Sequence, residues 1–301
     1  MKIFGNKNAA NHFCRMHIAF ITYKDEPKLF EDDQLIADYL ESKNIKVSPI
    51  PWDDETIDWT SFDTVVIRST WDYIHRAIEF NMWLGKLKDL GVKVLNPISV
   101  IQWNQHKSYF VDFSKKGILV PSFQYCPAKS KFELSSIIKE KGWDKAVVKP
   151  AVSAGSFNTW VVEKDNLANS QQRFAELLQT NDMIAQEFMN EVLTEGEWSL
   201  LFFNKKFSHA IIKKPKHGDF RVQAKFGGTD EPAQPDLSIV EQAERILKKV
   251  EEPLLYARVD GVITNDNKFW LMELELIEPV LFVKNSKNGC AHFYEALLSL
   301  C

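Results

Sequence analysis

Apolar residues in the first hundred positions alternate between short continuous runs and stretches at helical spacing. The continuous runs, which predict strands, cover 16–23, 45–50, 64–67 and 92–95. The helical stretches lie between them, at 30–41 and 77–90. Because alternating strands and helices are typical of a parallel sheet with right-handed crossovers, we expect a small α/β domain over residues 16–96, after a polar extension over residues 1–15.

A second pattern lies near the carboxyl end, where two strand-like runs flank a short polar break. Side chains alternate across a strand, so Arg258 and Asp260 share one face, and Glu273 and Glu275 share one face of the next strand. We predict a two-residue hairpin loop at 266–267. This loop would place Asp260 opposite Glu273 and Arg258 opposite Glu275.

The predicted hairpin brings three carboxylates and one guanidinium group together. Such a cluster among apolar neighbours is costly unless cations occupy it, and paired oxygen ligands suit Mg²⁺ that carries nucleotide phosphates. Asp260, Glu273 and Glu275 are therefore candidate metal ligands. The alternative is that these charges form the solvated face of a two-sided antiparallel sheet.

The middle of the chain holds candidate phosphate-binding residues. A short apolar run ends in Lys149 and is typical of a buried strand that carries an ammonium group at its tip. The small residues that follow include Ser153, Gly155 and Ser156, and their backbone amides can approach phosphate oxygens closely. An ordinary small-residue turn is the alternative, and the position directly after the lysine strand favours phosphate binding.

Ligands of a parallel sheet gather beyond the carboxyl ends of its strands. The segment after the third predicted strand holds Arg68, Trp71 and Asp72 and is our candidate substrate site. Arg68 could bind a carboxylate, Trp71 could form a wall, and Asp72 could bind an amine. The alternative is that Trp71 and Tyr73 only pack, while Arg68 and Asp72 form a surface ion pair.

In their order along the chain, these motifs resemble the ATP-grasp superfamily over about residues 96–283. The resemblance implies that the acidic residues hold two Mg²⁺ ions over the triphosphate of ATP, with Mn²⁺ as a substitute. Many members have asparagine where this chain has Glu275. The string at 271–282 resembles more specifically the cycloserine synthetase (O-ureido-serine cyclo-ligase) branch, which shares that departure and carries a segment like 68–73.

The resemblance also implies which residues contact the nucleotide. They are Lys107, Lys149, Gln186, Glu187, Phe188 and Glu197. The two lysines would meet the phosphates, the three consecutive residues would form the hinge that binds adenine, and the last glutamate would hold the ribose hydroxyls.

Two arginines complete the implied site. Arg221 matches the glutathione-synthetase-like arm of the superfamily, where this arginine meets the acyl phosphate or the bound substrate, and a planar guanidinium suits that bidentate task. Arg258 would help to balance the triphosphate. For the nearby Lys213, Lys214 and Lys216, a solvated basic loop is an equally good interpretation.

Composition limits the partners. The chain has 37 basic and 41 acidic residues and a formal net charge of −4, so we expect no nucleic-acid or membrane partner. Its four cysteines have no zinc-site spacing, which favours a reducing cytoplasm. No apolar run approaches the roughly 18 residues of a membrane span, and no signal peptide is evident. The oligomeric state, including a homodimer, stays open.

The expected fold is α/β, with two further α+β lobes, a central one over 97–188 and a carboxyl-terminal one over 189–301 that sandwich ATP. The resemblance implies an ADP-forming carboxylate–amine ligase, in which an amino-acid-like carboxylate attacks ATP and an amine or similar nucleophile captures the acyl phosphate. Two alternatives remain: a kinase on the same scaffold and a non-catalytic nucleotide-binding regulatory protein. The sequence names neither the acid nor the nucleophile, and it does not decide between ligation and ring closure.

Overall fold

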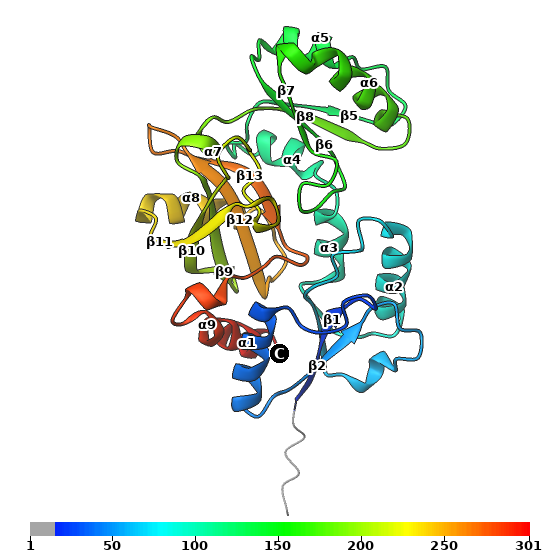
Figure 1. The fold of residues 1–301 in the computed structure, drawn as a ribbon. Coiled ribbons are helices and arrows are strands. Elements are labelled where there is room, and N and C mark those ends of the chain that lie inside the picture. Colours follow the sequence, from blue (N-terminus) through cyan, green and yellow to red (C-terminus); the bar gives the residue numbers. More distant parts are fainter. Residues whose placement is uncertain (1–15) are drawn as a thin grey trace, which may run out of the picture.

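A computed structural model describes residues 16–301 and contains three sheets, each covered by helices (Figure 1). The expected extension over 1–15 lies outside the described residues. Within 16–301, none of the helices combines the length and apolarity needed to cross a membrane.

The first sheet is parallel, with the order β2-β1-β3-β4. Its strands are β1 (His17–Thr22), β2 (Lys46–Pro51), β3 (Thr64–Ile67) and β4 (Val94–Leu95), and its helices are α1 (Glu31–Ser42) and α2 (Ala77–Asp89). Every element predicted for this region is present, and the α/β prediction is confirmed. The last strand is shorter than predicted, because its ladder with β3 begins at Val94.

The central sheet is antiparallel, with the order β5-β8-β6-β7. Its strands are β5 (Phe123–Cys126), β6 (Ala146–Pro150), β7 (Trp160–Val162) and β8 (Met183–Glu187), and its helices are α5 (Leu134–Lys141) and α6 (Leu167–Leu178). Ala146 and Val148 of β6 belong to the core shared with these helices. Because side chains alternate along a strand, Val147 and Lys149 lie on the opposite face, which lines a cavity.

The third sheet is also antiparallel, with the order β11-β10-β9-β12-β13. Its strands are β9 (Glu197–Phe203), β10 (Lys206–Lys214), β11 (Thr229–Ala233), β12 (Tyr256–Ile263) and β13 (Phe269–Glu275). The remaining helices are α3 (Ile98–Asn104), α4 (Tyr109–Lys115), α7 (Glu191–Thr194), α8 (Leu237–Leu247) and α9 (Gly289–Leu300). Ala257 and Val259 of β12 pack in the core with α4 and α8, so Arg258 and Asp260 lie on the other face.

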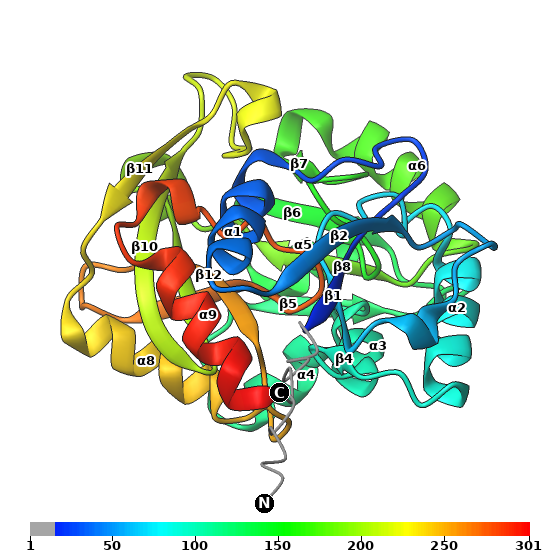
Figure 2. The ribbon, with the colours of Figure 1, turned by 90° about the horizontal axis from the view of Figure 1, so that it is seen from below.

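Helices α1 and α9 lie side by side and join the first sheet to the third (Figure 2). Their shared core contains Phe20 of β1, Phe203 of β9 and Phe293 of α9. The ring of Phe293 meets both other rings edge-on, with centroids 6.1 and 5.6 Å away. This continuous core fixes the first sheet against the sheet that carries the acidic residues.

The hairpin of β12 and β13 has the predicted pairing but not the predicted loop. Asp260 lies opposite Glu273, and Arg258 lies opposite Glu275. Thr264 pairs with Lys268, which leaves a three-residue loop instead of the two-residue loop that we predicted. A bulge between Asp260 and Gly261 corrects the register by one residue. Bulges of this kind often re-aim side chains next to functional sites.

Candidate active site

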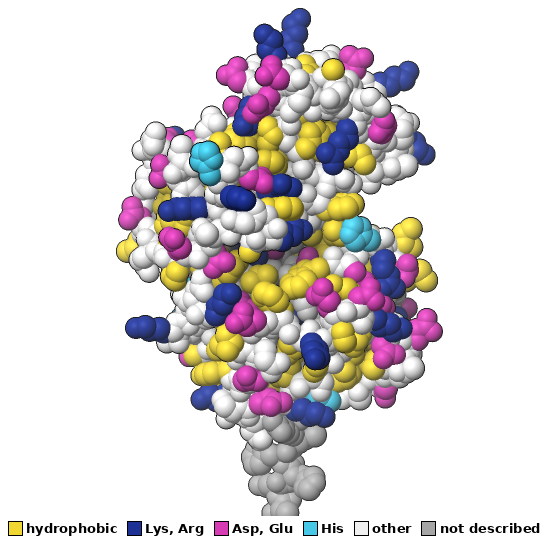
Figure 3. All heavy atoms as spheres, viewed as in Figure 1, with side chains coloured by type: hydrophobic (Ala, Val, Ile, Leu, Met, Phe, Trp, Pro, Cys, Tyr) yellow, Lys and Arg dark blue, Asp and Glu magenta, His cyan; other side chains and the backbone are white. Residues whose placement is uncertain are grey.

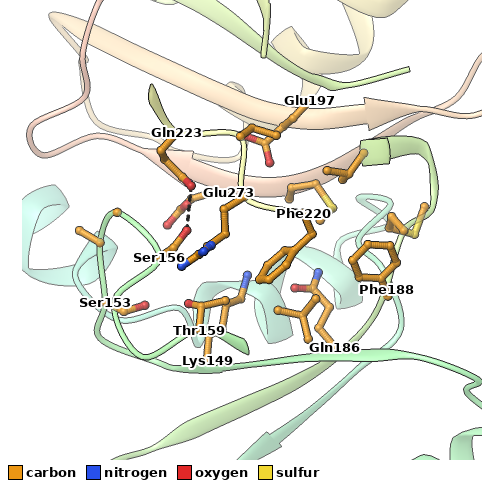
Figure 4. A pocket seen from close by; sticks show the side chains of 18 of the residues that line it. Lys149, Ser153, Ser156, Thr159, Gln186, Phe188, Glu197, Phe220, Gln223 and Glu273 are labelled. Carbon is orange, nitrogen blue, oxygen red and sulfur yellow. Dashed lines mark hydrogen bonds between the residues drawn. The ribbon is translucent and has the colours of Figure 1, made fainter. Parts of the chain in front are cut away.

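A group of charged residues lines a cavity between the central and third sheets. The cavity is open to solvent on one side, and both polar and apolar side chains line it, as is usual for sites that bind small ligands. Figure 4 shows Lys149, Gln186 and Phe188 on one side of it and Glu197, Phe220 and Glu273 on the other. On the molecular surface, basic side chains lie between the upper lobe and the rest of this face (Figure 3).

Both predicted phosphate-binding lysines point into this cavity. Lys107 is 5% exposed, and its Nζ lies 3.0 Å from Oε1 of Glu273. It also donates a hydrogen bond to the carbonyl oxygen of Ser153. Lys149 makes no ion pair within residues 16–301, and its Nζ lies 5.4 Å from the ring centroid of Phe110. Burial lowers the pKa of Lys149 to about 8, while Glu273 partly opposes that effect.

The small-residue loop after β6 lies beside the lysines, as expected. Ser153, Gly155 and Ser156 all line the cavity. Gly155 and Ser156 have positive φ angles of 54° and 62°, a conformation that opens backbone amides toward one side. Ser156 donates a hydrogen bond of 3.0 Å to Oε1 of Gln223, which ties this loop to the segment after β10 (Figure 4).

Only part of the predicted adenine-binding hinge lines the cavity. Gln186 and Phe188 line the cavity, whereas Glu187 does not, because side chains alternate at the end of β8. Glu197 lines the opposite side and forms an ion pair with Lys213. The cavity therefore has an apolar wall next to amide and carboxylate groups, a combination that can bind a flat base and a sugar.

The three candidate metal ligands are close together, but each already forms an ion pair with a lysine or arginine side chain. Asp260 forms ion pairs with Lys213 (3.1 Å) and Arg258 (3.0 Å) and accepts a hydrogen bond of 2.6 Å from Ser199. Glu275 is bound by Arg258, and Glu273 by Lys107. In the described part of the chain, no three acidic, histidine or cysteine side chains form a preassembled metal cluster.

These pairs shift the pKa values of the carboxylates in different directions. Burial alone would raise the pKa of Asp260, but Arg258 and Lys213 outweigh it and hold the pKa at about 2. For Glu273, the ammonium groups of Lys107 and Lys149 likewise outweigh burial and lower the pKa. Glu275 differs, because burial raises its pKa and Arg258 offsets this only in part. Ionised oxygens at the cavity fit a hard cation such as Mg²⁺.

The two glutamates, Glu273 and Glu275, face open space, whereas Asp260 lies behind them. Carboxylates in this arrangement fit Mg²⁺ that binds together with phosphates. Phosphate oxygens can pair with the lysines, which frees the carboxylates to bind the metal. Arg258, 8% exposed, also lies behind the glutamates and orients Glu275.

Arg221 lines the cavity but is held by its own loop. It forms a bidentate pair with Asp219, with a contact of 2.7 Å, and its guanidinium lies 3.7 Å from the ring centroid of Phe226. The Arg221 side chain is 34% exposed. A planar guanidinium with open solvent on one side can still meet an anionic group that enters the cavity.

The sequence-predicted substrate residues are not brought into this cavity. Arg68 is 1% exposed, pairs with Asp33 at 2.7 Å, and donates a hydrogen bond of 2.8 Å to the carbonyl oxygen of Pro279. Trp71 lies against Phe30, with ring centroids 5.4 Å apart. Both oxygens of Asp72 are occupied, one by Trp52 and one by Arg76. These three side chains therefore contact other protein groups near the end of β3 and do not line the cavity.

Several residues of the site were not singled out by the sequence. Lys213 is 6% exposed and binds two carboxylates, so the solvated-loop interpretation is wrong for this residue. Its position opposite Glu197 in the β9–β10 ladder is a signal that pairing of the two strands would have shown. Tyr73 and Glu278 line a second pocket next to Glu273 and Glu275.

Comparison with known proteins gives a consistent assignment. Residues 18–96 match the family model described as D-cycloserine synthetase DcsG, N-terminal domain. The chain is 26% identical over 260 residues to the cycloserine biosynthesis protein DcsG of Streptomyces lavendulae, which covers 82% of this chain and 86% of that protein.

Solved structures with the same fold include those of D-cycloserine synthetase DcsG and a D-alanine–D-alanine ligase. The crystal structure of D-cycloserine synthetase DcsG has a TM-score of 0.84 and 24% identity, and the match covers 94% of this chain and 99% of that one. D-alanine–D-alanine ligase from Bacillus anthracis in complex with ATP has a TM-score of 0.66 and 15% identity, over 94% and 96% of the two chains. The chain thus has the fold shared by D-cycloserine synthetase and D-alanine–D-alanine ligase, and it is similar in sequence to cycloserine synthetase.

Proposed function

We propose that this protein is an ATP- and Mg²⁺-dependent ligase that activates the carboxylate of a small amino-acid-like molecule and closes a ring within that molecule. The observation that carries the proposal is the junction of two pockets at Lys107 and Glu273, which line both. The larger pocket suits the nucleotide. The second is the smaller of the two, which favours a small molecule over a peptide.

The proposed reaction has two steps. A carboxylate oxygen attacks the γ-phosphorus of ATP, the bond to the β-phosphate oxygen breaks, and ADP leaves. A nitrogen of the same molecule then attacks the acyl carbon, phosphate leaves, and the nitrogen loses a proton to solvent. Both steps depend on positioning and charge neutralisation, so the protein needs no covalent nucleophile.

Different residues of the cavity would bind different parts of ATP and of the acyl phosphate. Lys107 and Lys149 bind the phosphates, and the 153–156 loop presents its amides to them. Gln186 and Phe188 hold the base, and Glu197 holds the ribose. Arg221 meets the acyl phosphate, whose charge develops only during the reaction.

Glu273 and Glu275, supported by Asp260, would hold two Mg²⁺ ions, for which Mn²⁺ can substitute. When bound, the metal supplies neutralising charge at the transferred phosphoryl group. Arg258 keeps Glu275 in place for that role. We further propose that the protein acts in the cytoplasm and that its partner is a small-molecule substrate.

The test is ADP release against a panel of acids, with mass detection of products. The panel contains both enantiomers of O-ureido-serine, common D- and L-amino acids and short peptides, each with Mg²⁺ or Mn²⁺. We expect ADP and a cyclised product from an O-ureido-serine, and hydroxamate formation when hydroxylamine is added to trap the acyl phosphate.

Two outcomes would contradict the proposal. A stable phosphorylated product without ring closure would indicate a kinase on the same scaffold. ATP binding by calorimetry without ADP release from any acid would indicate a nucleotide-binding regulatory protein.

A further inference from the structure

The pocket next to the metal-binding glutamates contains a carboxylate that the reaction scheme does not use. Glu278 lies three residues after Glu275, is 9% exposed, and lines this pocket together with Tyr73, Gln105 and Lys107. The pocket adjoins the nucleotide cavity, because Lys107 and Glu273 line both. A molecule that occupies it therefore has one end at the phosphates and the other near Glu278.

The backbone around Glu278 is fixed by buried side chains from distant parts of the chain. Asn96 donates a hydrogen bond of 2.8 Å to the carbonyl oxygen of Leu276, and the hydroxyl of Tyr256 donates one of 2.8 Å to that of Ile277. Arg68 donates one of 2.8 Å to the carbonyl oxygen of Pro279. Binding sites need such support, since a ligand gains most from a group that is already in place.

Glu278 differs from the other buried carboxylates around it. Glu273, Glu275 and Asp260 each contact a lysine or an arginine. Across residues 16–301, the carboxylate of Glu278 has neither an ion-pair partner nor a hydrogen-bond donor. An ionised carboxylate that is buried without a partner is costly to keep.

The electrostatics agree with this geometry. Burial, together with the neighbouring charges of Glu275 and Glu273, raises the pKa of Glu278 to about 8. Lys107 and Arg258 oppose this effect without cancelling it. A ligand cation in the pocket would restore the ionised form, because no lysine or arginine of the described residues forms an ion pair with Glu278.

We propose that Glu278 binds the ammonium group of the substrate, so that the pocket selects amino acids over the corresponding hydroxy acids. This inference rests on the proposed function and deepens it. The substrate carboxylate then points toward Lys107 and the nucleotide, and the ammonium group points away from them. In this proposal Glu278 binds the amine, the role that the sequence suggested for Asp72. Both oxygens of Asp72 are bound to protein groups outside the pocket.

The experiment compares two substrates in three proteins. The substrates are O-ureido-serine and its analogue with a hydroxyl group in place of the α-amino group. The proteins are wild type, Glu278→Gln, and the control Glu241→Gln, which removes one negative charge from the exposed surface of α8. Glutamine keeps the shape of the side chain and removes its charge.

We expect Glu278→Gln to raise KM for the amino substrate by about tenfold to hundredfold, the range for one charge-assisted hydrogen bond. KM for the hydroxy analogue, the Kd of ATP and the Mg²⁺ dependence should stay within about twofold of wild type. The melting temperature should not fall, because Glu278 has no ion-pair or hydrogen-bond partner in residues 16–301 to lose. A residue with only a structural role would not change the ratio of the two KM values.

Three results would overturn the inference. They are an equal loss for both substrates, a raised Mg²⁺ requirement, and a KM ratio that changes in Asp72→Asn but not in Glu278→Gln. If Glu278→Gln unfolds, Glu278→Asp provides the test. Its side chain is shorter, so the carboxylate stays but lies farther from the ligand, and KM should rise for the amino substrate alone.

The inference and the proposed function fail in different ways. If wild type releases no ADP with any acid, the proposed function is wrong. Calorimetry with a non-hydrolysable ATP analogue then still compares binding of the two molecules to wild type and Glu278→Gln, and equal discrimination in both proteins contradicts the role of Glu278.

Discussion

Replacement of Lys149 by methionine should weaken ATP binding and stabilise the protein without its ligand. Lys149 projects from the end of β6 into the cavity and has no carboxylate partner in residues 16–301. Burial lowers its pKa from an ordinary 10.5 to about 8. A lowered lysine pKa means that the folded protein disfavours the charged form, so at neutral pH the charge costs folding free energy.

The size of this cost follows from the pKa. Each pH unit corresponds to about 1.4 kcal/mol, so a fall from 10.5 to about 8 gives roughly 3 kcal/mol at pH 7. Lys149 is only partly buried and opens into the cavity, so water screens its charge and we expect about 1–2 kcal/mol. The cost is fully present below pH 8 and disappears as the pH rises toward 10.5.

Urea unfolding of wild type and Lys149→Met at pH 7 and pH 10 measures this effect. The variant should be more stable by about 1–2 kcal/mol at pH 7, and the difference should shrink at pH 10. By calorimetry, the Kd of Mg·ATP should rise about tenfold to hundredfold, because a charge-assisted hydrogen bond to phosphate is lost.

The matched control is Lys139→Met, on the exposed side of α5, which should change neither quantity. The reasoning fails if Lys149→Met is less stable than wild type at pH 7, or if it binds Mg·ATP with wild-type affinity.

Two further predictions concern the charged residues of the site. Glu273→Gln should abolish most Mg²⁺-dependent turnover and lower stability slightly, because it leaves Lys107 without its 3.0 Å partner; unchanged ADP release at saturating Mg²⁺ would argue against the metal role. The stability that Glu273 contributes is present above its ordinary pKa and is lost as the pH falls through its lowered pKa, so wild type and variant should converge in acid denaturation. Arg68→Ala should cost about 3–5 kcal/mol of stability, since it leaves Asp33 buried without a partner, whereas Arg221→Ala should keep the wild-type melting temperature and lower kcat. A stable Arg68→Ala protein with only a raised substrate KM would restore the direct substrate role of Arg68.

Local patterns were sufficient to predict the elements and the pairing that carry most of the site. Alternation along a strand places Arg258 and Asp260 on one face whatever the rest of the fold does. The pairing of Asp260 with Glu273 was right although the loop was wrong, because the bulge at Gly261 offsets the extra loop residue. Gly261 leaves no room for a side chain against Phe269 and Trp270 of the partner strand, and a glycine inside a strand is a bulge signal that our prediction did not use.

Residues whose partners lie far along the chain could not be placed from the sequence. Arg68 looked free to bind a ligand, but it is buried, and Asp33 and Pro279, separated from it by 35 and 211 residues, bind two of its three nitrogens. Lys213 looked solvated, yet the third sheet surrounds it with Glu197 and Asp260. In each case the type of the residue was informative, whereas its burial depended on tertiary contacts that no local pattern encodes.

The distribution of unpaired charge predicts how ligands are oriented in the two pockets. Most buried charges of the site pair with one another, so they remain neutralised before a ligand binds. Within the described residues, Lys149 and Glu278 are exceptions of opposite sign, the first in the nucleotide cavity and the second in the small pocket. An unpaired ammonium group favours an anion, and an unpaired carboxylate favours a cation. A polyphosphate in the cavity and an ammonium group in the small pocket would satisfy both, which leaves the substrate carboxylate between them, next to Lys107, where phosphoryl transfer has to occur.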